Sequence, residues 1–473
     1  MTGKMFGLVK DRVSLLQFLF VIVFFLSSIL RMGLALVNRE AFDNHIEVIN
    51  FILQNDKLPL KEDCPECFQP KVFYYSVATA VRLAGVNPSH QNSIIILAQL
   101  MNFIAGEIVL VFAYLLIRDL HCHDRGIGLI AFSLLAFNPA LIEANGMASN
   151  DAFAIFFSSA AIYACFKFLQ KGGFGYLLLS SLLVSLGIAV KTNVWATALA
   201  IFLTLLLKGL SNRRFVEVST SIAFLLGSVV LVFLNPLSQY IINIQNYKIP
   251  VTLSLSPAPF PSFFEKTYVR RPGIISIQDG LFTVKFIDLL AYPRLTLGPT
   301  DYPPYRTSLW ANLYGSANSV HFLNSPDSWH TTPDFAVTRS IFILALLPTA
   351  FFLIGAVGGL IALLRGIIGN VGVLLEKRFY GLFDMLFLAY FLFEVLYALL
   401  YRDFSFMKSI FIYPAILAFV VLFLEGADRF KNFVSRQSGL VMVLCNTVFV
   451  SLVFGYSVDI VQIIAHLYKL NFS

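Results

Sequence analysis

The residues best suited to chemistry are acids that stand beside long apolar segments. Asp43 and Glu47 lie four residues apart in a stretch with apolar residues at helical spacing, so both would share one face of a short helix on the membrane. Asp151 opens an apolar segment directly after Ser149 and Asn150. Two carboxylates at one membrane face are suited to acid–base catalysis on a polar reactant. The plainer alternatives are interfacial acids that face water, and a helix start stabilised by the helix dipole.

Basic residues near the same predicted membrane face are suited to binding a phosphate. Arg offers two parallel hydrogen bonds to phosphate, whereas Lys offers a compact charge. Stabilising the charge of a leaving phosphate in a partly dry site would supply much of a reaction's rate. The alternative for each residue is that its stem lies along the interface while its charge reaches water. The candidates are Lys71, Lys191, Arg306, Arg402 and Lys408, with Arg270 and Arg271 in the same long loop as Arg306.

Two short cysteine- or histidine-containing motifs have residue types that bind metals. Cys64-Pro-Glu-Cys67 precedes Lys71 and could form a small disulfide in an oxidising compartment, half of a metal site, or two free thiols. His121-Cys122-His123-Asp124 resembles a ligand set, although a simple polar loop is the plainer interpretation. These patterns require no cofactor, and they leave a divalent metal open.

The elements that must position these residues are membrane helices. Of 473 residues, 58% are hydrophobic and 13% are charged, so lipid must cover part of the surface. The first apolar run, Val13 to Val37, is too long for a cleavable signal peptide and predicts a first span. The net charge of +7 is distributed over loops, which argues against nucleic acid as a partner.

Apolar segments of spanning length predict about eleven transmembrane helices. With the N-terminus in the cytoplasm, every predicted cytoplasmic segment carries at least two Lys or Arg residues, as the positive-inside rule requires. The C-terminus then lies outside. The adjacent segments 174–190 and 192–207 could also be one interrupted helix. The remaining predicted spans are 13–37, 93–117, 127–142, 151–168, 216–234, 338–364, 381–400, 408–425 and 439–466.

Two predicted outside loops are long, at 38–92 and 235–338. The second is rich in aromatic residues, which argues against disorder, so we expect short helices packed on the membrane surface. We expect residues 1–473 to form one transmembrane domain, with Asp43 in its first loop and no separate C-terminal soluble domain.

Several motifs, taken in order, resemble GT-C membrane glycosyltransferases of the protein mannosyltransferase and aminoarabinose transferase type. In the first loop they are Phe42-Asp43-Asn44-His45-Ile46-Glu47, Lys57-Leu58-Pro59 and Phe68-Gln69-Pro70-Lys71-Val72-Phe73-Tyr74-Tyr75. Later in the chain they are Ser149-Asn150-Asp151-Ala152-Phe153, the segment from Gly187 to Asn193, the segment from Ser308 to Gly315, and the segment from Lys408 to Pro414.

The resemblance implies an all-α GT-C fold and transfer of a sugar from a polyprenyl-phosphate-linked donor to an acceptor outside the cytoplasm. The acceptor would be a glycolipid, a polysaccharide or a protein. In that mechanism Asp43 is the general base and Asp151 assists it. Because Asn44 and Gln69-Pro70-Lys71 depart from the family pattern, a family metal site stays open. The substrate-site candidates are His45, Glu47, Gln69, Tyr74, Asn150 and Trp310.

Two other classes of protein remain open. A multi-span transporter or lipid flippase would carry charges in mid-span and broken helices. Glu107 and Glu394 are the main mid-span charges here, whereas most polar groups gather in the outside loops. A non-catalytic scaffold would tolerate loss of the acids. The single glycosylation acceptor, Asn471-Phe-Ser473, favours a prokaryotic plasma (inner) membrane, with the site facing the periplasm or exterior.

Overall fold

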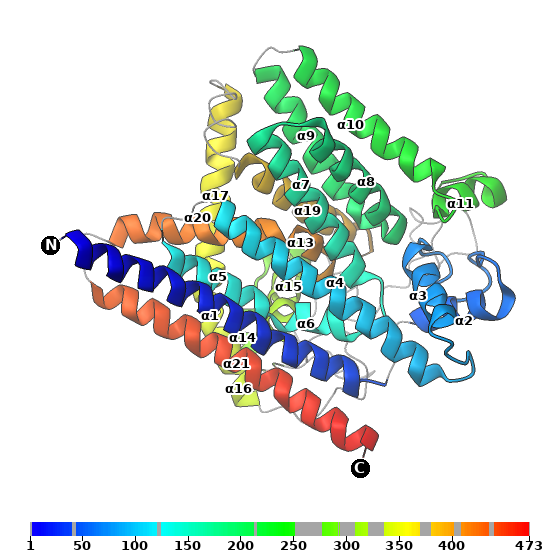
Figure 1. Cartoon of the computed structure of the whole chain (residues 1–473), viewed down its shortest axis with the longest axis horizontal. Coiled ribbons are helices and arrows are strands. Elements are labelled where there is room, and N and C mark those ends of the chain that lie inside the picture. Colours follow the sequence, from blue (N-terminus) through cyan, green and yellow to red (C-terminus); the bar gives the residue numbers. More distant parts are fainter. Residues whose placement is uncertain are drawn as a thin grey trace.

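The protein is a bundle of long helices that cross one another at varied angles (Figure 1). In the part of the chain that the structure describes there is no strand, so the all-α prediction is confirmed. The computed structural model describes residues 2–39, 44–120, 124–211, 215–250, 277–291, 293, 308–319, 335–368, 380–401, 408–434 and 439–472.

Within these ranges, eight helical segments are long and apolar enough to cross a membrane. The helices α5 (Arg125–Ala136) and α6 (Pro139–Gly146) meet at a bend of 44° and would together form a ninth. The predicted count of eleven stays a prediction, because α8 (Phe174–Val190) is shorter and α20 (Ile416–Val434) ends in charged residues. The eight segments are α1 (Thr2–Val37), α4 (Gln91–Asp119), α7 (Asp151–Lys171), α9 (Trp195–Ser211), α10 (Phe215–Leu234), α16 (Phe335–Leu344) with α17 (Leu346–Ile368), α19 (Tyr380–Tyr401) and α21 (Gly439–Phe472).

The structure corrects the span predicted at 408–425. Its long helix, α20, begins only at Ile416, after the 3-10 turns η5 (Ser409–Phe411) and η6 (Tyr413–Ala415). Pro414 has no backbone N–H to donate and is disfavoured inside a regular helix, so it lies in the turn just before one. Hydropathy alone did not show this irregular entry segment, which also carries Lys408.

The two segments around residue 190 are separate helices. The helix α8 ends at Val190, and Lys191 is extended, with φ −154° and ψ 133°. The 3-10 turn η1 (Thr192–Val194) then leads directly into α9. This break places the side chain of Lys191 at the end of both helices rather than on the face of either.

Glycines let α17 and α20 approach backbone to backbone. A methyl group added at Gly355 would lie 1.9 Å from the carbonyl oxygen of Leu422, and one added at Gly426 would lie 1.7 Å from the carbonyl oxygen of Phe351. Small residues at such contacts allow the close packing that holds helices together in lipid.

The short helix α6 is held from α1 by a buried arginine. The Nε of Arg31 donates to Asn145 Oδ1 at 3.0 Å, and its Nη2 donates to the carbonyl of Ala136 at 2.6 Å. The Nδ2 of Asn38 donates to the carbonyl of Gly146 at 3.0 Å. Because α1 contacts the residues before α6 and those at its end, α6 has a fixed position ahead of the turn that leads to Asp151.

The first long loop forms α2 (His45–Asn55) and α3 (Val72–Leu83), and both lie at one end of the bundle beside α11 (Gln239–Tyr247) (Figure 1). The two loops are in contact. The hydroxyl of Tyr247 donates to Glu62, and the ammonium of Lys61 lies 4.7 Å from the centre of the Tyr247 ring. In the second loop the described helices are α13 (Ile277–Phe282), α14 (Phe286–Ala291) and α15 (Leu309–Asn318).

Candidate active site

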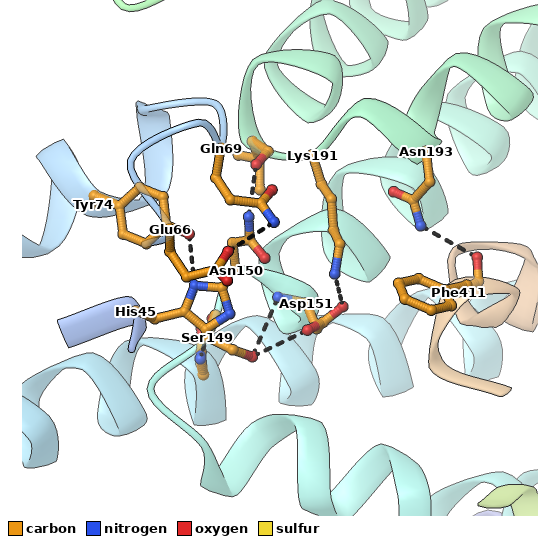
Figure 2. Close-up of polar contacts among 12 residues, drawn as sticks. His45, Glu66, Gln69, Tyr74, Ser149, Asn150, Asp151, Lys191, Asn193 and Phe411 are labelled. Atoms are coloured by element: carbon orange, nitrogen blue, oxygen red, sulfur yellow. Dashed lines mark hydrogen bonds and ion pairs between the residues drawn. The ribbon is translucent and has the colours of Figure 1, made fainter. Parts of the chain in front are cut away.

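An enclosed ion pair joins the first residue of α7 to the residue that follows α8. Lys191 Nζ pairs with Asp151 Oδ1 (Figure 2), and the two side chains are only 11% and 16% exposed. The hydroxyl of Ser149 donates to the other carboxylate oxygen of Asp151 at 3.3 Å. Water screens a pair this enclosed only weakly, so each charge strongly affects a reacting group nearby. We call Asp151 and Lys191 the central pair.

The segment before α20 forms one wall of the central pair. The Phe411 ring centre lies 5.4 Å from Lys191 Nζ, a favourable position for a cation over an aromatic ring. The Nδ2 of Asn193 donates to the carbonyl of Phe411 at 3.2 Å (Figure 2). Residues more than two hundred positions apart in the sequence therefore meet at this point.

The first loop approaches the central pair from the other side (Figure 2). The Nδ1 of His45 and the hydroxyl of Tyr74 share a hydrogen bond of 2.6 Å, and both side chains are buried. His45 is close enough to Asp151 to interact with it electrostatically. Asn150 donates from Nδ2 to the carbonyl of Val190 at 3.1 Å, which ties the start of α7 to the end of α8.

A buried amide on α4 fixes the turn that carries Asp151. The Nδ2 of Asn102 donates to the carbonyl of Met147 at 2.6 Å and to the carbonyl of Ser149 at 2.7 Å. The prediction from sequence missed Asn102. The available signal was a pair of amides, Gln99 and Asn102, one turn apart within an apolar stretch of a long helix.

Cys64 and Cys67 form a disulfide, with their Cα atoms 5.0 Å apart. Of the three alternatives for the Cys-x-x-Cys motif, this is the one present in the structure. Lys71, buried at the start of α3, donates from Nζ to the carbonyl of Cys67 and, at 2.8 Å, to that of Gln69. Burial lowers the pKa of Lys71 to about 7, although Asp63 and Glu66 act in the opposite direction. The geometry therefore ties Lys71 to its own loop.

A second group of charges lies next to the central pair. Lys408, at the start of η5, interacts electrostatically with Glu143 on α6 and with Glu394 on α19. Glu143 also interacts with Asp151. The prediction from sequence quoted Glu143 only as part of a motif and gave it no role.

The remaining candidates lie elsewhere. Glu47 is exposed in the first turn of α2, which agrees with the plainer interpretation of that acid. Gln69 donates to Glu66 at 3.2 Å. Trp310 stacks on Phe391 at 5.8 Å and donates to the carbonyl of Leu281 at 2.7 Å, which is a contact of α15 with its neighbours. Asp43, Arg306, Arg402, Arg270, Arg271 and the motif from His121 to His123 lie outside the described residues.

Among the described residues, no group of three or more His, Cys, Asp or Glu side chains is arranged to hold a metal ion. The central pair is suited to orienting a polar reactant at Asp151 and to stabilising a charged leaving group at Lys191.

Residues 69–240 match the family model of dolichyl-phosphate-mannose-protein mannosyltransferases. The predicted resemblance to protein mannosyltransferases is therefore confirmed. The matched range contains Asn102, Asn150 and the central pair, whereas His45 and Phe411 lie outside it. The comparison with curated protein sequences gave no match.

Three solved structures are distant likenesses. Apo ArnT from Cupriavidus metallidurans is 14% identical, with 91% of this chain and 80% of that chain covered and a TM-score of 0.37. ArnT from the same organism bound to undecaprenyl phosphate is 15% identical, with 89% and 78% covered and a TM-score of 0.34. The apo oligosaccharyltransferase of Archaeoglobus fulgidus is 14% identical, with 96% and 56% covered and a TM-score of 0.42.

Proposed function

We propose that this multi-span membrane protein is a glycosyltransferase that moves a sugar from a polyprenyl-phosphate-linked donor to an acceptor outside the cytoplasm. The observation that carries the proposal is the central pair, which lies within the range that matches a mannosyltransferase family model. The pair stands where α7 begins and α8 ends, and charged groups at such places of a membrane protein are usually functional.

The reaction replaces one bond at the sugar by another. The acceptor hydroxyl attacks the anomeric carbon, the bond from that carbon to the phosphate oxygen breaks, and its electron pair leaves with the phosphate. Asp43 takes the proton from the attacking hydroxyl. Asp151 orients the acceptor, and Lys191 and Lys408 bind the departing phosphate, whose charge these lysines stabilise.

Enclosure supports this assignment of the lysines. Lys191 is held by Asp151 on one side and by the Phe411 ring on the other, so its ammonium is positioned before any substrate arrives. Such preorganisation lowers the cost of stabilising charge during the reaction. Lys71, by contrast, already donates to two carbonyls, and we assign it to holding the first loop.

The donor sugar is a hexose or a pentose, and the acceptor is a glycolipid, a polysaccharide or a protein. The membrane is the plasma (inner) membrane, with the central pair facing the periplasm or exterior. The positive-inside rule predicts that the start of α7 lies on this side of the membrane.

The test supplies purified protein with a panel of undecaprenyl-phosphate-linked hexoses and pentoses and with an extract of cell-envelope acceptors. Mass spectrometry follows the release of undecaprenyl phosphate. Asp43→Asn and Asp151→Asn are the test variants. Asp56→Asn is the matched control, because Asp56 is 86% exposed and makes only a surface pair with Arg82. Release by wild type and control but not by the test variants supports the proposal, and no release from any donor contradicts it.

A further inference from the structure

Glu143 is a carboxylate near the central pair, and its surroundings are unusual. It is partly exposed, whereas the residues beside it on α6 are buried. In the described part of the chain its carboxylate accepts no hydrogen bond and has no ion-pair partner within 4.0 Å. An acid enclosed among helices normally obtains such partners, because desolvation without them is costly.

The charges that act on Glu143 come from three separate elements. They are Lys408 before η5, Asp151 at the start of α7 and Asp459 on α21. Asp459 is 1% exposed, so this neighbourhood lies inside the bundle. Glu143 therefore shares an electrostatic environment with the central pair. Glu143 belongs to α6 and interacts with Asp459 of α21, whereas His45 belongs to the first loop.

Another charged side chain in this region, on α19, also points to a ligand. Glu394 is fully buried, and neither of its carboxylate oxygens meets the geometric criteria for a hydrogen bond, although the backbone N–H of Lys408 faces it. Lys408 thus interacts electrostatically with both Glu394 and Glu143. Both carboxylates accept few hydrogen bonds within the described protein, and they share one lysine. Their remaining acceptor oxygens are available to a molecule that donates hydrogen bonds.

Hydrogen bonds from several elements fix the helix that carries Glu143. Besides the contacts from α1, the Nδ2 of Asn138 at the start of α6 donates to the carbonyl of Ala317 at 2.9 Å. The hydroxyl of Tyr413 donates to Asn138 Oδ1 at 2.8 Å. The helix α6 is thereby fixed to α1, α15 and η6, and a side chain on a fixed helix is the precise kind of binding group that a substrate site needs.

We propose that Glu143 binds hydroxyl or amino groups of a sugar at the reaction centre. This inference rests on the proposed glycosyltransferase function. A carboxylate accepts hydrogen bonds and donates none, which matches sugar hydroxyls and amines, and it repels the donor phosphate. The sugar belongs either to the acceptor or to the donor, and the test separates these two sources.

The test compares wild type with Glu143→Gln, which keeps the size of the side chain and removes its charge. Three quantities are measured: binding of bare undecaprenyl phosphate, release of undecaprenyl phosphate from the donor in water alone, and release in the presence of the acceptor extract. Glu62→Gln is the control, because Glu62 is exposed and its amide oxygen would still accept from Tyr247. Gel filtration checks that each variant is folded.

Loss of a hydrogen bond to a charged group predicts a fall of about tenfold or more. A fall confined to acceptor-stimulated release places the acceptor sugar at Glu143. A fall in both kinds of release, with binding of bare undecaprenyl phosphate unchanged, places the donor sugar there. An unchanged rate, or equal loss of phosphate binding, overturns the inference while the proposed function stands. No release by wild type overturns both.

Discussion

The ammonium of Lys191 lies 5.4 Å from the centre of the Phe411 ring, and the two residues come from the two halves of the chain. Their contact joins the range that matches the mannosyltransferase family model to a segment well beyond it. The carbonyl of Phe411 is held by Asn193, two residues after Lys191, so the contact has a second attachment. This relationship makes the entry to α20 part of the candidate site.

Replacing Phe411 by Leu removes the aromatic face and leaves an apolar side chain. A cation over an aromatic ring contributes about 0.5–2 kcal/mol, so we expect a several-fold loss in the rate of donor turnover with little change in thermal stability. Phe411→Tyr keeps the ring and is the matched control. Equal rates for the Leu and Tyr variants would show that the ring does not act on Lys191.

Replacing Asn102 by Leu removes two hydrogen bonds from the turn before Asp151. Each buried carbonyl left without a donor costs about 1–3 kcal/mol, so we expect a lower melting temperature together with reduced turnover. Gln99 lies one turn earlier on α4, is fully buried, and has neither side-chain polar atom hydrogen-bonded in the described structure. Gln99→Leu should therefore be neutral or stabilising. A melting temperature that falls equally in both variants contradicts this account.

Lys71 predicts how stability depends on pH. Its pKa of about 7 lies below the ordinary value of 10.5, because burial disfavours the charged form. As pH falls from about 10.5 to about 7, the unfolded chain takes up this proton and the folded protein does not, so stability is lost across this range. Below about pH 7 the loss is complete.

The measurement is the melting temperature of wild type and of Lys71→Met from pH 6 to pH 10. Relative to the Met variant, wild type should gain stability as pH rises above about 7. A difference between the two proteins that does not change with pH would mean that Lys71 keeps an ordinary pKa in the folded protein.

Adding a methyl group at Gly355 should separate α17 from α20. The new carbon would lie 1.9 Å from a backbone oxygen that cannot move independently of its helix, and overpacking of this kind costs about 1–3 kcal/mol. Gly175→Ala is the control, because a methyl group there meets nothing within 4 Å. The melting temperature should fall for Gly355→Ala and not for Gly175→Ala. An unchanged value for both would show that the helices are less tightly packed than described.

Much of the helical fold could be predicted, because apolar runs of spanning length rarely form anything other than membrane helices. Asp151 at a helix start and Lys191 at a helix break were both visible as charges beside apolar segments. Their pairing was not visible, because local patterns do not specify which ends of α7 and α8 meet. Phe411 was quoted only within a motif and given no role, because one phenylalanine among 48 carries no mark of its function. Asn102 and Glu143 gained importance only from neighbours distant in sequence.

The two lysines also show that the sequence does not reveal the partner of a charged side chain. Lys71 and Lys191 looked equivalent in sequence, since each stands beside an apolar segment near the same predicted membrane face. The structure separates them by their partners, which are two carbonyls of its own loop for Lys71 and the carboxylate of Asp151 for Lys191. The charge of a side chain is evident from the sequence, whereas the group with which it pairs depends on the fold.

The central claim is that sugar transfer takes place at the pair formed by Asp151 and Lys191. Its most direct test is the initial rate at which undecaprenyl phosphate is released from the donor that wild type uses, with acceptor present, in wild type, Asp151→Asn and Asp56→Asn. Groups that act on the proton or orient the nucleophile contribute about 10²–10⁴-fold, so Asp151→Asn should slow release by at least about a hundredfold while Asp56→Asn matches wild type. A folded Asp151→Asn protein that releases undecaprenyl phosphate at the wild-type rate would contradict the account.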